Sequence, residues 1–541
     1  MVSWSDEMME KSANPNTPSP QHSITPPSSM VRSTGAVGVA TMTSRVLGLV
    51  REMIFASFMG QGLEASAFFY AFTIPNLFRR LLGEGALSAA FVPVFTERLH
   101  KEGRDAAWRA ANTVASAVSV ILVAIAVLFI GGLLLVLAVA DMSGSQQLIV
   151  RLTATMFPYM IFICLAGLAM GVLNSMRHFF VPAFSPVLMN IVLIGSVYIL
   201  CPLFGRTLDS QVMGLAVGVL FGGVVQLAYQ VPQLWREGWR PRWSLNWRDE
   251  TLLQVGRLIT PSVIGVVAYQ INVIVARTLG FLVGDYVPAA LNNADRLMEL
   301  PLGVFSVSLA TYMLPTLSAI AARDAMEEFR REIGRALRFL MVITVPATVG
   351  LIVLSEPIVR LLFERGRFDA ESTGHCAFAL QFTAIGLSFY SGTSILARGF
   401  YALKDTRTPM YVSLCSMAAN LAFSLCLMWP MKEGGLALAN SLSAILNSII
   451  LFVLLRRRLG TLHGRLLASG AARVTVAALI MAAACWATHH WLADWLPPTT
   501  LAHNLALVFG PITVGAAVYF VAALVLAREE MRAILHGYRH G

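Results

Sequence analysis

The sequence predicts an all-α, polytopic membrane protein, and two observations carry that prediction. The 541 residues are 56% hydrophobic and 13% charged, whereas soluble proteins carry roughly 25% charged residues. The mean hydropathy is +0.68, and the apolar residues gather in runs of about 20, the length that crosses a bilayer as a helix. The chain is therefore predicted to have about 14 transmembrane helices joined by polar loops.

Windows of about 20 apolar residues place the predicted spans, in chain order, near residues 33–58, 65–96, 112–138, 151–174, 182–203, 213–233, 252–280, 286–317, 335–359, 376–402, 409–429, 434–455, 474–497 and 503–527. The residues before the first span are rich in Pro and Ser and lack the apolar run of a signal peptide. We therefore expect residues 1–32 to form a disordered cytoplasmic tail.

Basic residues alternate from loop to loop, and this alternation predicts the topology. The terminal tails and the loops after even-numbered spans hold about 27 Lys and Arg residues, and the other loops hold about 6. Because Lys- and Arg-rich loops stay in the cytoplasm, both termini are expected there. The net charge of +10 follows from this topology, so no nucleic-acid partner is expected. Arg360, Arg365 and Arg367 are an exception, since they follow the ninth span.

Three predicted spans each carry a polar, cationic stripe. The stripe residues are Thr41, Ser44, Arg45, Gly48, Arg51 and Glu52 in the first span, Asn76, Arg79, Arg80, Gly83 and Glu84 in the second, and Asn292, Asp295, Arg296 and Glu299 in the eighth. At 100° per residue these sets fall within arcs of roughly 120°, 140° and 100°. A cation at bilayer depth is costly, and it usually marks a substrate site, a counter-ion or a water-filled cavity.

Ion pairs between helices, or arginines that reach the headgroups, are the alternative explanation of such charges. That explanation is favoured for three arginines, namely Arg80, Arg277 and Arg398. A cavity for an anion is favoured for Arg45, Arg51, Arg79 and Arg296, because each nearby acid can neutralise at most one neighbour. No lysine lies deep in a span, and the planar guanidinium suits bidentate binding of phosphate.

A weak internal duplication divides the chain. Residues 171–182 and the later Asn190 resemble residues 399–409 and the later Asn420, six spans further along. Two such units would be related by an axis along the membrane normal, as in transporters built from parallel repeats. The predicted domains are therefore an N-lobe at residues 33–235, a C-lobe at residues 236–460, and a C-terminal helix pair with its tail at residues 461–541.

The chain carries no motif for covalent chemistry. It has no GxxxxGK[ST] phosphate loop and no CxxC pair among its six cysteines. Polar residues in the seventh, eleventh and twelfth spans could ligate a cation, but hydrogen bonding between helices is the favoured role. These residues are Gln270, Asn272, Asn420, Asn440 and Asn447. The sequence thus predicts no catalytic residue, no metal and no cofactor, and favours a transporter over an enzyme.

Three segments carry a resemblance to a known family. They are TSRVLGLVREMIFASFMG at 43–60, AFFYAFTIPNLFRRLLGEGALSAAFVPVF at 67–95 and ADRLMELPLGVFSVSLATYMLP at 294–315. They closely resemble the lipid II flippases of the MurJ (MviN) family, within the multidrug/oligosaccharidyl-lipid/polysaccharide exporter superfamily. The likeness extends from about residue 33 to the end of the chain.

The resemblance implies two six-helix lobes, a central cationic cavity for the diphosphate and sugar headgroup, and a last helix pair that forms a groove for the undecaprenyl tail. The essential arginines of the family match the four favoured above, Arg45, Arg51, Arg79 and Arg296. Its supporting polar residues match Ser44, Asn76, Glu84 and Glu299.

The resemblance also implies a function and a place in the cell. Such a protein moves lipid II from the cytoplasmic to the periplasmic leaflet of the bacterial inner membrane by alternating access, for peptidoglycan synthesis. The implied partners are lipid II and membrane lipids, with cell-wall synthesis proteins as candidates. The chain departs from the family at Ser66, where an aspartate is common. It also lacks the carboxylates through which some relatives bind sodium in the seventh, eleventh and twelfth spans, so the membrane potential is the expected source of drive.

Two other classes of function are weighed against this one. A related polysaccharide-lipid exporter or a cation-coupled drug exporter would share the fold, but a drug exporter needs acidic residues to meet cationic drugs. The surplus of arginine argues against it. A scaffolding membrane protein would explain the basic loops but not the three cationic stripes.

Overall fold

The computed structural model describes residues 28–80, 86–460, 462, 464–495, 501–528 and 530–531, and every regular element among them is a helix. The all-α prediction is therefore confirmed. Among the described residues, nine helical segments are long and apolar enough to cross a membrane. The count of fourteen spans stays a prediction.

The first half of the chain supplies the predicted spans one to six. Its helices are α1 (Ser28–Met59), α2 (Leu63–Phe78), α3 (Ala86–Lys101), α4 (Arg104–Val139), α5 (Gly144–Met156), α6 (Tyr159–Ser175), α7 (Phe180–Ile199), the short 3₁₀ turn η2 (Cys201–Phe204) and α8 (Leu208–Arg236). The second and fourth predicted spans each correspond to two helices, α2 with α3 and α5 with α6. Helix α1 begins earlier than the predicted first span, inside the segment expected to be a disordered tail.

The second half supplies the remaining spans. Its helices are α9 (Glu250–Val283), α10 (Val287–Pro301), the π-turn η3 (Leu302–Ser306), α11 (Val307–Ala322), α12 (Met326–Val353), α13 (Ser355–Phe363), α14 (Ala370–Ile385), α15 (Leu387–Ala402), α16 (Arg407–Leu459), α17 (Gly464–Trp495) and α18 (Leu501–Leu526). Helix α16 covers both predicted spans eleven and twelve. The break between the two spans lies at Lys432, whose φ of 48° is not helical. The short helix α13 was not distinguished from the ninth span by its sequence.

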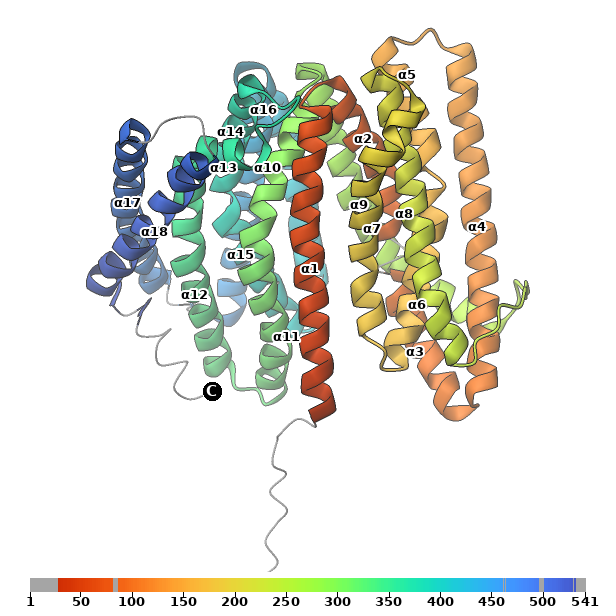
Figure 1. Ribbon diagram of the computed structural model, residues 1–541. Helices are drawn as coiled ribbons and strands as arrows, with labels where there is room; N and C mark the ends of the chain where they lie inside the picture. Colours follow the sequence, from red (N-terminus) through yellow and green to blue (C-terminus); the bar gives the residue numbers. More distant parts are fainter. Residues whose placement is uncertain are drawn as a thin grey trace, which may run out of the picture.

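The helices form two packed groups with a pair at one edge (Figure 1). Helix α1 stands between α4–α8 on one side and α10–α18 on the other, and α17 and α18 lie at the far edge. One apolar core buries Phe68, Phe157 and Leu193, and a second buries Phe329 and Phe400. Helix α9 joins both groups, because Val255 belongs to a buried cluster with residues of α3 and α4, while Leu279 belongs to a cluster with residues of α10, α13 and α14.

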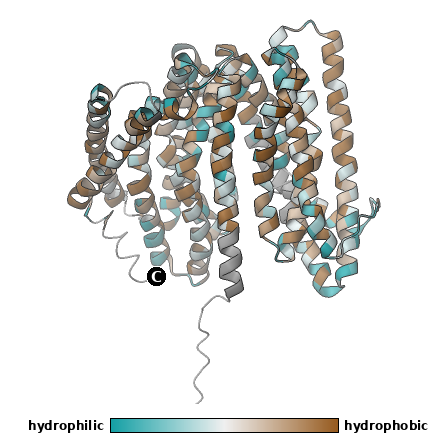
Figure 2. Ribbon diagram, viewed as in Figure 1, coloured by the Kyte–Doolittle hydropathy of each residue, from teal (hydrophilic) through white to brown (hydrophobic). Residues whose placement is uncertain are grey.

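The outer surface of α4 shows why this assembly suits a bilayer. Large apolar side chains are exposed along it from Ile121 to Val139. Hydrophobic residues dominate this part of α4, while hydrophilic residues gather toward its lower end (Figure 2). In water such a surface would be strongly unfavourable, whereas lipid tails cover it at no cost.

Candidate functional site

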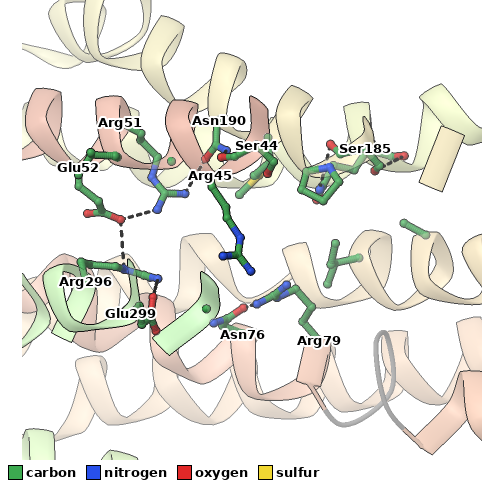
Figure 3. Close-up of a pocket in the computed structure, with 18 of the residues that line it drawn as sticks. Ser44, Arg45, Arg51, Glu52, Asn76, Arg79, Ser185, Asn190, Arg296 and Glu299 are labelled. Carbon is green, nitrogen blue, oxygen red and sulfur yellow. Dashed lines mark hydrogen bonds and ion pairs between the residues drawn. The ribbon is translucent and has the colours of Figure 1, made fainter. Parts of the chain in front are cut away.

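The three cationic stripes meet at one cavity of about 540 Å³ between the two groups of helices (Figure 3). All the predicted site residues but one line it, namely Ser44, Arg45, Arg51, Asn76, Arg79, Arg296 and Glu299. The remaining one, Glu84, lies outside the described residues. Helices α1, α2 and α10 each present one stripe to the cavity, as expected for polar residues that share one face of a helix.

Glu52 links arginines of the two groups of helices. Its carboxylate pairs with Arg51, its neighbour on α1, and its Oε1 lies 3.4 Å from Nε of Arg296 on α10. Arg296 also donates from Nη1 to Oε2 of Glu299 at 2.8 Å. The side chain of Glu52 is 4% exposed, so this buried carboxylate orients both guanidinium groups at the cavity wall.

Asn190 of α7 is a site residue that sequence reasoning missed. Its Oδ1 accepts from Arg51 Nη1 at 3.0 Å, and its Nδ2 donates to the backbone carbonyl of Ser44 at 3.1 Å. Asn190 therefore fixes the guanidinium of Arg51 from the side opposite Glu52. The sequence analysis used Asn190 only as part of the internal duplication. A lone amide in an apolar span was the signal that could have identified it as a site residue.

Arg79 and Arg45 complete the cationic wall. Arg79 donates from Nε to Oδ1 of Asn76 at 2.6 Å. Arg45 lies against Gly303, where a Cβ would stand 2.6 Å from Nη1 of Arg45, so this glycine leaves room for the guanidinium. Within the described part of the chain no carboxylate pairs with Arg45. Four arginines and two glutamates line the described cavity, so its wall is cationic.

A second cavity of about 1260 Å³ continues from the first and shares Arg51, Glu52, Arg296 and Glu299 with it. Away from this shared wall its lining is mixed: apolar residues, neutral polar residues of α9, α15 and α16, and three further charged residues, Arg80, Arg277 and Asp295. Asn420 Nδ2 donates to Asn440 Oδ1 at 2.9 Å. The cavity reaches residues 401–410, a loop that the charge alternation predicts to be cytoplasmic.

No metal site is evident in these cavities. Among the described residues, no group of three or more His, Cys, Asp or Glu side chains could hold a metal ion. Asn420 and Asn440 bond to each other within α16, whereas Gln270 Nε2 and Asn447 Oδ1 are buried without a partner among the described residues. The structural role favoured for these residues therefore stays a prediction.

At the opposite end, hydrogen bonds join the two groups of helices. Arg277 of α9 donates from Nη1 to the carbonyl of Phe69 at 2.8 Å and to Oγ1 of Thr73 at 2.6 Å, both on α2. The backbone N–H of Ala289 on α10 donates to Oγ of Ser66 at 3.1 Å. These bonds agree with the structural role favoured for Arg277, although this residue also lines the second cavity. Ser66 makes a neutral contact at this position.

A close backbone contact lies at the same end. The N–H of Arg367 donates to the carbonyl of Ser57 at 3.0 Å. Gly366, at φ +60°, has room only for hydrogen, because a Cβ there would lie 2.5 Å from the Ser57 carbonyl oxygen. Gly60, at φ +66°, is equally close to Arg367. We call this contact, made by Ser57, Gly60, Gly366 and Arg367, the glycine latch.

The three arginines that depart from the charge alternation lie in the latch segment or just before it. Arg360 pairs with Glu356 at 2.7 Å and with Glu364 at 3.3 Å, and Arg365 donates to the carbonyl of Leu361 at 2.7 Å. These arginines hold the segment that carries the latch. The cavities are therefore closed at the end that carries the latch and extend to residues 401–410 at the other end. With the predicted topology, this arrangement faces inward.

Comparison with known proteins assigns the chain to a family. A family model described as lipid II flippase MurJ matches residues 55–505. The chain belongs to this family. A relative from Vibrio cholerae, described as a probable lipid II flippase MurJ, is 33% identical over 513 residues, which cover 92% of this chain and 96% of the relative. The resemblance seen in the sequence is thus confirmed.

Solved structures share the fold. The structure titled lipid II flippase MurJ in an inward closed conformation superposes with a TM-score of 0.75 at 24% identity, and covers 92% of this chain and 99% of its own. An inward-facing multidrug resistance MATE transporter of the MOP superfamily superposes with a TM-score of 0.63 at 17% identity, and covers 79% and 98%. Because a drug transporter has a similar fold, the substrate must be argued from the cavity.

Proposed function

We propose that the chain is a lipid II flippase, which moves the undecaprenyl-diphosphate-linked headgroup from the cytoplasmic to the periplasmic leaflet. The observation that carries this proposal is the cavity in which Arg45, Arg51, Arg79 and Arg296 come together from three helices of both lobes. Membership of the MurJ family supports it. The protein acts as a transporter and not as an enzyme, because moving the headgroup breaks no covalent bond.

The four arginines bind the diphosphate. A guanidinium can donate two parallel hydrogen bonds to one phosphate group, and such charge-assisted bonds are roughly twice as strong as neutral ones. Glu52 and Glu299 neutralise part of the charge and orient Arg51 and Arg296, so the wall keeps an excess of positive charge for an anion. Ser44 and Asn76 support the site by bonding Asn190 and Arg79.

The second cavity accepts the rest of the headgroup. Its neutral amides and hydroxyls, among them Asn272, Ser413 and Asn447, can exchange hydrogen bonds with sugar hydroxyls and peptide groups. The lipid tail stays in the membrane along α17 and α18, where Leu479, Phe509 and Phe520 are exposed. This division keeps the apolar tail out of a polar cavity.

Transport follows from alternating access. The latch end opens as the other end closes, and the bound diphosphate then faces the periplasm. An inside-negative potential is worth about 2.3 kcal/mol per charge per 100 mV, and it favours outward movement of the anion and return of the empty cationic cavity. The protein would sit in the bacterial inner membrane with both termini in the cytoplasm.

The test is translocation of fluorescent lipid II in liposomes that contain only this protein. We expect flipping by the wild type and by R398A, because Arg398 bonds to Ser394 of its own helix, and no flipping by R45A or R79A. A cation-coupled drug exporter is the second candidate, supported only by the shared fold. Uptake of a cationic dye without flipping of lipid II would favour that candidate and contradict our proposal.

A further inference from the structure

The loop that joins α8 to α9 carries a segment of unusual composition. Residues 239–248 read WRPRWSLNWR, with three arginines, three tryptophans and no acid. We call these ten residues the strap. The strap projects from the side of the molecule beyond α4, nearer the end at which α1 begins (Figure 1). It lines neither of the two cavities.

Hydrogen bonds fix the strap to α4. The Asn112 side chain accepts from Nε1 of Trp239 at 2.9 Å and donates to the carbonyl of Arg240 at 3.0 Å. The N–H of Ser244 donates to Oγ of Ser116 at 3.1 Å, and the hydroxyls of Thr113 and Ser244 lie 3.2 Å apart. The strap is therefore a built element of the surface, with a defined inner and outer side.

Its outer side combines apolar rings with positive charge. Trp243 is 70% exposed, Trp247 is 49% exposed and Leu245 is 41% exposed. Arg242 and Arg248 are also exposed. Tryptophan with arginine is typical of the membrane interface, where the ring lies among the headgroups and the guanidinium meets lipid phosphate.

The acids that flank the strap do not cancel its charge. Glu237 pairs with His178 at 2.7 Å and lies 3.8 Å from Arg104. Asp249 accepts from the N–H of Thr251 at 2.9 Å and caps α9. Glu250, in the first turn of α9, also adjoins the strap, and the three arginines of the strap outnumber the two acids that follow it. The outer side of the strap therefore stays cationic.

The position of the strap along α4 matches the depth of lipid headgroups. The exposed apolar surface of α4 begins at Ile121, five residues or about 7.5 Å beyond Ser116, where the strap is bound. It ends near Val139, so it is about 28 Å long, close to the roughly 30 Å of a hydrocarbon core. The headgroup layer adds roughly 5–7.5 Å on each side of that core, so the strap meets this layer at its outer edge, where Ser244 is bound to Ser116.

We propose that the strap is a binding site for anionic phospholipid in the leaflet that the charge alternation predicts to be cytoplasmic. Arg242 and Arg248 bind lipid phosphate, and Trp243, Leu245 and Trp247 insert among the headgroups. The strap lies in the linker between α8 and α9, at the start of the predicted C-lobe. It therefore holds the linker at a fixed depth on α4 while α9 moves with transport, and this role does not depend on the substrate.

The test compares two double variants of the full chain, R242Q/R248Q and R331Q/R457Q. The second removes the same charge from exposed arginines at the ends of α12 and α16, on the same predicted side. Binding of phosphatidylglycerol is measured by native mass spectrometry on protein released from phosphatidylcholine discs. An arginine that meets lipid phosphate contributes roughly fivefold to such binding, so we expect about 30-fold weaker binding for the strap variant. Arg331 and Arg457 have no tryptophan beside them in the sequence to hold a headgroup in place, so the control should bind almost as the wild type does.

A second experiment measures how deep the strap lies in the membrane. A nitroxide at L245C, on a background without native cysteines, should be more accessible to oxygen than to a water-soluble nickel chelate. Equal lipid binding by the two double variants, or a label freely accessible to nickel, would overturn the proposal. So would a strap variant that keeps phosphatidylglycerol but loses lipid II, since the strap would then serve the substrate.

Discussion

Replacing Gly366 by alanine should shift the protein away from the inward-facing state. In the glycine latch, a Cβ at Gly366 would lie 2.5 Å from the carbonyl oxygen of Ser57. Ordinary contact begins near 3.4 Å, so the two segments must separate by about 0.9 Å. The bond from Arg367 to Ser57 is then lost at about 1 kcal/mol, and residual crowding adds about 1 kcal/mol or more.

These costs fall only on the state in which the latch is closed. A difference of about 2 kcal/mol changes the ratio of the two states by about 30-fold. Alanine at a positive φ is strained in either state, and the control G103A introduces such strain away from the latch. Gly103 has φ +87°, and nothing lies within 4 Å of its Cβ position.

The assay is electron–electron double resonance between spin labels at D141C and E371C, on a background without native cysteines. Both positions lie at the end of the molecule that carries the latch, one on each lobe. G366A should lengthen the main distance, while G103A should leave it as in the wild type. Identical distance distributions for G366A and G103A would refute the role of the latch in closing this end.

Three further outcomes are expected. Alkaline phosphatase fused after Gly62 should be active and one fused after Arg104 silent, and the opposite pattern would overturn the topology. E52Q should bind pyrophosphate more tightly than the wild type in a calorimetric titration, because Arg51 and Arg296 lose their shared carboxylate; weaker binding would show that Glu52 is needed to orient them. D405N should lower the thermal midpoint at pH 7 by the equivalent of up to about 1 kcal/mol, because it removes the charge that pairs with Arg458. Because the N–H of Thr408 holds the pKa of Asp405 below its ordinary 3.8, this difference should vanish as the pH falls below about 4, and a constant difference would contradict it.

The sequence predicted which helix faces meet, because helical periodicity and the cost of a buried charge act locally. Arg45, Arg79 and Arg296 could be assigned to a common cavity from their stripes alone, and the structure places them around one. Their role in binding lipid II stays a prediction. Helix breaks were less visible, since Lys432 is an ordinary polar residue whose φ of 48° depends on the packing around it.

Contacts between distant helices could not be predicted. Glu52 was expected to pair locally, and it does pair with Arg51, but its second contact with Arg296 spans more than two hundred residues. Asn190 gave no sign of bonding Arg51. The glycine latch was equally invisible, because its glycines face a backbone carbonyl and carry no side-chain pattern. Such contacts depend on the relative placement of two lobes, which single-helix periodicity does not encode.

The most direct test of the central claim is lipid II binding to arginine variants at matched expression, measured by native mass spectrometry. Alanine at Arg45, Arg51, Arg79 or Arg296 should abolish binding. Lysine should retain part of it, because a point charge still attracts the diphosphate but cannot form the bidentate contact. If the alanine and lysine variants bind lipid II as well as the wild type and yet fail to flip it, the arginines control the movement of the lobes and do not form the diphosphate site.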